Sequence, residues 1–252
     1  MAIESEQVFA FLDDLLETDG FPDYPGAHNG LQVEGPTHLE RLAVAVDASL
    51  EVIQESVRLG AGLLLVHHGL FWGGAAPLTG TRFQKVAALV NGRLALYGSH
   101  LPLDAHAEVG NSAVLARHLD LSDLTPFGRH GEKYVGWAGV RPGTLGDLQK
   151  DLAREVDGPV MNVGAGPATV ARVCVVTGSG SSFLDEAVAA GADTLITGEA
   201  PHHAAIAARE AGLNLLLAGH YATETFGVKA LAHRLEEEFQ LPWDFVHRPT
   251  GL

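Results

Sequence analysis

Short apolar segments alternate with segments of helical periodicity along most of this chain. Near the start, apolar runs at 41–46 and 63–66 flank a helical pattern at 49–59. Ser49 can cap that helix and Gly60 can end it. Parallel strands need a crossover connection, usually a helix, so the alternation predicts a mostly parallel sheet with helices on both faces. We therefore expect a three-layer α/β fold.

The alternation continues to the far end of the chain and is interrupted once. The segment 120–132 is rich in turn residues and is the best boundary candidate. It divides the chain into two α/β lobes, residues 1–125 and 126–252. Further strands are predicted at 94–97, 133–140, 170–176, 194–197, 213–217 and 243–247, and further helices at 4–17, 80–91, 108–119, 144–156, 181–190, 202–211 and 222–238.

The two predicted lobes repeat one pattern of strand, polar turn, helix, Gly-Ala and strand. The third strand of each copy is followed by a histidine and, four residues later, an acid. These pairs are His100 with Asp104, and His220 with Glu224. Helices and strands alone look alike in any two such units, but the shared histidine–acid pair favours an internal duplication.

The composition limits the classes of protein to which the chain can belong. It has 16 basic and 31 acidic residues, and the formal charge of −15 argues against binding to nucleic acid or to an anionic membrane. Its single Cys excludes an intramolecular disulfide. No apolar run approaches the ~18 residues of a membrane span, and the acidic first residues lack the basic region of a signal peptide. We expect a cytoplasmic protein.

Histidine is unusually frequent, with 13 residues, and several histidines follow predicted strands. Sites in parallel α/β folds lie at the carboxyl ends of strands. Each histidine pair alone also fits a structural hydrogen bond, but three strand ends together supply imidazoles and carboxylates. This set suits Zn, Mn, Fe, Co or Ni, and it exceeds the three protein ligands of a catalytic zinc. We predict a dinuclear metal centre with open positions for water, with the candidates His67, His68, Asp104, His220 and Glu224.

Five short motifs, taken in order, resemble a known family. It is the Ngg-interacting-factor-three-like dinuclear metal centre family, often called GTP cyclohydrolase 1 type 2 homologues. The resemblance covers nearly the whole chain, and each motif is short while the set is specific. The motifs are Asn29-Gly30-Leu31-Gln32-Val33, His67-His68-Gly69, His100-Leu101-Pro102-Leu103-Asp104 through Gly110-Asn111, Thr197-Gly198-Glu199 and Gly219-His220-Tyr221-Ala222-Thr223-Glu224.

The resemblance implies properties that the residues alone do not give. It implies that His67, His68, Asp104, His220 and Glu224 bind two divalent metal ions, in a site between two α/β lobes. It also implies a toroidal homo-hexamer. The longer members of the family carry an inserted domain, for which this chain is too short. The cyclohydrolase label comes with the family name and no residue here derives it.

Other polar residues are weaker candidates. We expect His100 to orient a ligand or to pass protons, and Pro102 to hold the segment after it in an extended loop. Glu199 is a candidate general base, with a structural hydrogen-bond acceptor as the alternative. His202 and His203 fit surface positions at a helix start, or a role facing a substrate.

A second group of residues has a structural interpretation beside each functional one. Asp47 either reaches the site or caps the next helix, and Asn111 is a candidate helix cap. The turn at 177–182 fits a tight turn, or a backbone cradle for phosphate. Cys174 lies within an apolar strand and belongs to the core.

Three functions follow from this pattern. The first is a metal-dependent hydrolase that activates water on a phosphate-containing or nucleotide-like small molecule. The second is a non-catalytic protein, either a metal-handling protein or an adaptor assembly. The third is DNA binding through the central hole of a ring, against which the charge of −15 argues.

Overall fold

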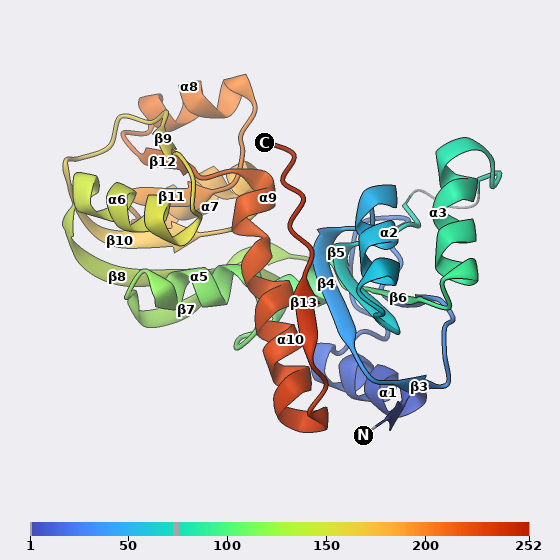
Figure 1. The fold of residues 1–252 in the computed structure, drawn as a ribbon. Coiled ribbons are helices and arrows are strands. Elements are labelled where there is room, and N and C mark those ends of the chain that lie inside the picture. Colours follow the sequence, from blue (N-terminus) through green and yellow to red (C-terminus); the bar gives the residue numbers. More distant parts are fainter. Residues whose placement is uncertain (1, 73–75, 252) are drawn as a thin grey trace. The chain divides into compact units, whose positions relative to one another are not determined.

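The computed structural model describes residues 2–72 and 76–251. The chain divides into two compact units, one of Met1–Leu103 with Gly227–Arg248 and one of Asp104–Phe226 with Pro249–Leu252. Each unit is built on a sheet with helices packed against it (Figure 1). The predicted α/β fold with two sheet-containing lobes is therefore confirmed.

The first unit contains a five-stranded sheet in the order β13-β4-β5-β6-β2, in which only β2 runs antiparallel to its neighbour. Ala43 and Leu64 on one face pack with α2 and α3, which lie together in Figure 1. On the opposite face Tyr97 stacks on Phe9 of α1. The elements are β1 (Ile3–Glu4), α1 (Ser5–Leu16), β2 (Gly30–Val33), β3 (His38–Leu39), β4 (Leu42–Asp47), α2 (Leu50–Arg58), β5 (Leu63–His68), α3 (Gly80–Asn91), β6 (Ala95–Gly98), α4 (Leu101–Ala105), α10 (Thr225–Phe239) and β13 (Trp243–Phe245).

The second unit contains a six-stranded sheet in the order β7-β8-β10-β11-β12-β9. Its centre, β10 to β12, is parallel, and the flanking strands run antiparallel. Helix α5 packs on β8 and β10, and α8 packs on β12. The elements are α5 (Asn111–His118), β7 (Ser122–His130), β8 (Lys133–Thr144), α6 (Leu145–Glu155), β9 (Met161–Asn162), β10 (Thr169–Val175), the 3₁₀ helix η1 (Gly180–Phe183), α7 (Leu184–Ala189), β11 (Thr194–Thr197), α8 (His202–Glu210), β12 (Asn214–Leu217) and α9 (His220–Thr223).

The compact units differ from the predicted lobes 1–125 and 126–252. Residue 125 lies inside β7, which pairs with β8 in the second sheet. Segment 120–132 is an edge strand with several exposed polar residues rather than a linker, and this exposure explains its turn-like composition. At the other end of the chain, β13 pairs in parallel with β4, so the last strand returns to the first sheet.

Side-chain caps begin two of the helices, and Ser49 is the cap that the sequence predicted for α2. The Ser49 hydroxyl accepts a hydrogen bond from Val52 N at 3.1 Å, and Thr144 accepts one from Asp147 N at 3.1 Å. The extended loop predicted around Pro102 is wrong, because α4 contains this residue. Pro102 is the second residue of α4, where its missing N–H has no helical acceptor to lose.

Candidate metal centre

His67 and His68 are the last two residues of β5, a strand between two parallel neighbours. The sequence prediction placed them after the strand, and the pairing of Asp47 with His68 extends it through both. Nδ1 of His68 lies 2.9 Å from an Asp47 carboxylate oxygen. Nδ1 of the buried His67 lies 3.0 Å from the carbonyl oxygen of Ser99, at the end of the neighbouring strand. Asp47 therefore contacts the site through His68.

His100 lies two residues beyond β6, and the loop at 20–30 holds it. Its Nδ1 lies 2.9 Å from Asp23 Oδ1, and its backbone N–H donates to Asn29 Oδ1 at 2.8 Å. Asn29 in turn donates to Asp23 at 2.8 Å. Burial raises the pKa of Asp23, but the hydrogen bond and positive charge of His100 and the hydrogen bond from Asn29 outweigh it and lower the pKa to about 2.

His67, His68 and His100 share one arrangement. Each has Nδ1 against an oxygen that accepts a hydrogen bond, which places the lone pair of the neutral ring on Nε2. The ring centroid of His67 lies 4.7 Å from that of His68 and 5.1 Å from that of His100. One candidate ligand atom from each ring lies within 4.8 Å of the others. Imidazoles oriented in this way fit a first-row divalent metal ion.

Trp72 packs against this histidine cluster, and the sequence did not predict it. Its ring centroid lies 4.9 Å from His100 and 6.0 Å from His68. The preceding turn is fixed by Gln32, whose side-chain oxygen accepts from Leu70 N at 2.8 Å. An aromatic ring over two imidazoles limits the access of water to them.

His220 is the first residue of α9 and Glu224 directly follows its last residue, which brings the two side chains into contact as their spacing predicted. Nε2 of His220 lies 3.1 Å from Glu224 Oε1, and its Nδ1 lies 3.0 Å from Glu199 Oε1. The hydrogen bond with Glu224 is the main cause that raises the His220 pKa to about 9; burial opposes it, and the charge of Glu224 and contact with Glu199 add to it. A metal ion bound here would take the place of that proton.

A glycine makes room for this pair. Gly178 follows β10 in the left-handed region, with φ of +63°, and a Cβ there would clash with the Glu224 carboxylate. The buried Thr223 hydroxyl accepts from Gly178 N at 3.0 Å, which fixes the turn against α9. The close approach of backbone and carboxylate requires glycine at this position.

Asp104 lies in α4, largely buried at 8% exposure. The Asn111 side-chain amide donates to its Oδ1 at 2.9 Å. Asn111 is therefore a partner of Asp104; the residue at the cap position of α5 is Gly110. The boundary between the units falls within α4, and the second unit begins at Asp104. The second unit thus contributes the buried acids Asp104 and Glu224 together with His220, all candidates from the sequence.

Three backbone donors of the turn at 177–182 are bound within the protein. Thr177 N donates to Ser112 Oγ at 3.2 Å, and Gly180 N donates to Thr197 Oγ1 at 2.8 Å. With the bond from Gly178 to Thr223, the backbone donors at the start of the turn are bound within the protein. These bonds favour the tight-turn alternative.

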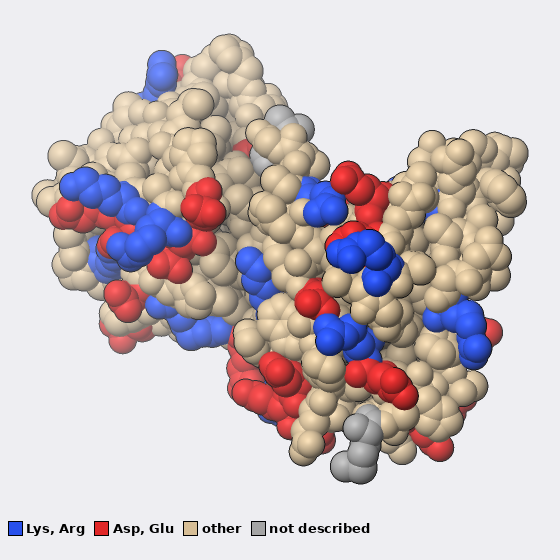
Figure 2. Space-filling view, in the orientation of Figure 1, with Lys and Arg blue, Asp and Glu red and all other residues tan. Residues whose placement is uncertain are grey.

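The remaining candidates lie at a helix start or in the core. His202 and His203 are exposed at the first two positions of α8. Cys174 is fully buried in β10, and burial raises its pKa to about 12. Within the described ranges, no helix is long and apolar enough to cross a membrane. On the face drawn in Figure 2, acidic and basic side chains are intermixed and form no continuous basic surface.

Fold and site together define a two-unit α/β protein with histidine and carboxylate groups that could bind a metal ion. The chain belongs to the Duf34/NIF3 (NGG1p interacting factor 3) family, whose model matches residues 3–249. The family predicted from the motifs is thereby confirmed.

Relatives span nearly the whole chain. A protein of Deinococcus radiodurans named GTP cyclohydrolase 1 type 2 homolog is 44% identical over 99% of this chain and 95% of its own length. One of Halobacterium salinarum with the same name is 45% identical, over 95% of this chain and 96% of its own. The crystal structure of a Thermus thermophilus protein, TTHA1606, matches with a TM-score of 0.92 and 39% identity, covering 99% of this chain and 100% of that one.

Proposed function

We propose that this protein is a metal-dependent hydrolase for a phosphate-containing or nucleotide-like small molecule. In this proposal His67, His68, Asp104, His220 and Glu224 hold two divalent ions, of Zn, Mn, Fe, Co or Ni. The observation that carries it is the shared orientation of His67, His68 and His100, each with Nδ1 against an acceptor. The pairing of His220 with the buried Glu224 gives further support.

Each residue would have a defined task. Bound ions would polarise a phosphoryl or carbonyl oxygen and lower the pKa of a water molecule. Asp47 and Ser99 orient the rings of His68 and His67. His100 and Glu199 are our candidates for proton transfer, and Glu199, with a half-exposed side chain, can exchange protons with solvent. Its contact with His220 also supports a positioning role.

A non-catalytic metal-handling or adaptor role is the second candidate. The observation that favours it is the turn at 177–182, where three backbone donors that could bind a phosphate are already bound within the protein. The same ligands would then hold ions for transfer or for structure alone. Turnover, rather than metal content, separates the two candidates.

Elemental analysis of purified protein tests the metal ligands. We expect about two ions per chain, and a clear loss of metal in Asp104→Ala. The matched control is His202→Ala, which removes an exposed histidine outside the proposed set. Unchanged metal content in Asp104→Ala would refute the ligand assignment.

An activity screen tests the hydrolase. The metal-loaded protein is assayed against nucleotides and phosphoesters, together with Glu224→Gln. Hydrolysis that is lost in this variant supports the enzyme, whereas reversible metal exchange without hydrolysis supports metal handling.

We further propose the toroidal homo-hexamer. Its support is the membership in the family whose resemblance implied it. Light scattering coupled to size-exclusion chromatography should give the mass of six 26.5 kDa chains. A monomer or dimer at micromolar concentration would contradict it.

A further inference from the structure

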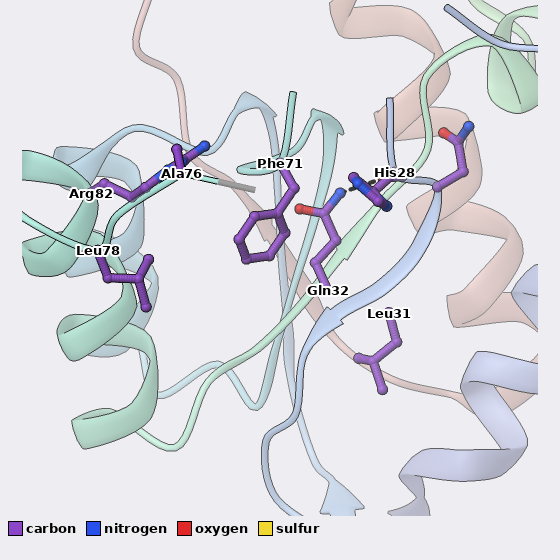
Figure 3. Close-up of a pocket in the computed structure, with 8 residues that line it drawn as sticks. His28, Leu31, Gln32, Phe71, Ala76, Leu78 and Arg82 are labelled. Atoms are coloured by element: carbon purple, nitrogen blue, oxygen red, sulfur yellow. Dashed lines mark hydrogen bonds between the residues drawn. The ribbon is translucent and has the colours of Figure 1, made fainter. Parts of the chain in front are cut away.

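A cavity of about 560 Å³ lies within the first unit, beside the loop that follows β5 (Figure 3). This volume is within the range of about 300–1,000 Å³ typical of small-molecule pockets. Strand β2 with the segment before it forms one wall, and α3 with the segment before it forms another. The lining residues are His28, Asn29, Leu31, Gln32, Phe71, Ala76, Leu78 and Arg82.

Aromatic and aliphatic side chains form most of the inner surface of the cavity. Phe71 lies between the α3 wall and the β2 wall in Figure 3. Its ring meets the His28 ring edge-to-face, with the centroids 6.2 Å apart. Leu31 and Leu78 are 42% and 50% exposed, so both offer apolar surface to a ligand. A planar aromatic ring would cover these groups and stack on Phe71.

Arg82 provides a positive charge at the same cavity. It lies in the first turn of α3, which contains no acidic residue. No carboxylate in the described ranges forms an ion pair with this guanidinium. Its planar fork is suited to a phosphate or a carboxylate, and the adjacent helix N-terminus favours the same charge.

The amides in the wall are already used within the protein. Gln32 donates to the His28 carbonyl at 2.5 Å and accepts from Leu70 N. Asn29 is bound to Asp23 and to the backbone of His100. These bonds hold the β2 wall in place. A ligand would therefore be recognised by the aromatic and leucine side chains and by Arg82.

We propose that this cavity binds a planar aromatic ring that carries a phosphate or carboxylate, as a nucleoside monophosphate does. The loop connects the cavity to the candidate metal centre, because Phe71 faces the cavity while the next residue, Trp72, packs on His68 and His100. The inference deepens the proposed function by assigning the aromatic ring and the anion of such a substrate to this cavity. The inference rests on the proposed function in one respect: it takes the ligand bound in the cavity to be the substrate of the hydrolase.

Calorimetric titration of the chelator-treated, metal-free protein tests the cavity separately from the metal site. The probes are GMP, UMP and 4-nitrophenyl phosphate. Guanosine and ribose 5-phosphate serve as half-ligands that lack the anion or the aromatic ring. The variants are Phe71→Ala and Arg82→Gln. The matched control for Phe71→Ala is Phe83→Ala, which removes a 57% exposed ring from α3. The matched control for Arg82→Gln is Arg93→Gln, which removes an exposed guanidinium just after the end of α3.

We expect at least one aromatic anion to bind, and Phe71→Ala and Arg82→Gln each to raise its Kd by about tenfold or more. The two controls should leave the Kd within about twofold, and both half-ligands should bind more weakly than GMP. A thermal melt of each variant verifies folding. Absence of binding by all three probes, or equal binding by wild type and both variants, would overturn the inference.

The outcome is independent of the metal proposal. Protein that binds GMP through Phe71 and Arg82 but purifies without metal would support the cavity and refute the metal centre. Protein with two ions per chain and no such binding would do the reverse.

Discussion

The orientation of single side chains decides what the histidine cluster can do. His67, His68 and His100 were recognised in the sequence because each ends or follows a predicted strand. The sequence did not predict all of the hydrogen-bond acceptors that orient their rings. Asp23 lies 77 residues from His100, in a loop without periodicity, so only the folded chain reveals the contact. Sequence spacing predicts which strand end a residue occupies, but it does not predict partners that another loop brings in.

The lowered pKa of Asp23 predicts a pH-dependent contribution to stability. The folded pKa of about 2 is below the ordinary 3.8, so the contribution is complete above about pH 5 and is lost as the pH falls toward 2. We expect Asp23→Asn to lower the free energy of unfolding by about 2 kcal/mol at pH 7, and by less at pH 3. Urea unfolding of both proteins at the two pH values measures this. An equal difference at pH 7 and pH 3 would contradict the role of the charge.

At the scale of elements, local signals predicted most helices and strands within a few residues. Strand β11 matches its predicted range, and α2 begins directly after its predicted cap Ser49. The errors have physical causes. Pro102 was taken as a helix breaker although it fits a first turn, and β7 resembled a linker because it is an exposed edge strand.

The cap of α2 provides an element-scale test. Ser49→Ala removes the bond to Val52 N and should lower the free energy of unfolding by about 1 kcal/mol. Thr79→Ala is the matched control, because Thr79 holds the same position at α3 without a side-chain capping bond. Chemical unfolding measures both variants. Equal losses would show that the cap bond is not the cause.

The turn after β10 provides a second test. In Gly178→Ala the new Cβ adds both a strained φ and a clash with Glu224. In the control Gly191→Ala, φ is +72° but nothing lies within 4 Å of the Cβ. We expect Gly178→Ala to lose about 1–3 kcal/mol more stability than the control, as measured by urea unfolding. Losses of the same size would mean that Glu224 moves aside freely.

At the scale of the whole molecule, the predicted duplication has a structural counterpart. In each sheet two parallel strands joined through a helix lead to a third parallel strand, and a short helix follows. In the first copy this helix is α4, which contains Asp104; in the second it is α9, which begins at His220 and is directly followed by Glu224. The sequence pattern found both copies because their strand–helix rhythm is local. It did not give the division of the chain, because the pairing of β13 with β4 joins segments about 200 residues apart.

The metal centre can be tested by anomalous X-ray diffraction from crystals of the metal-loaded protein. Data collected on both sides of the absorption edge of the bound metal locate each ion without assuming its ligands. We expect two ions per chain within bonding distance of His67, His68, Asp104, His220 and Glu224, at about 2.0–2.2 Å for zinc. A single ion, or ions bound at the exposed His202 and His203 with none at the proposed ligands, would contradict this expectation.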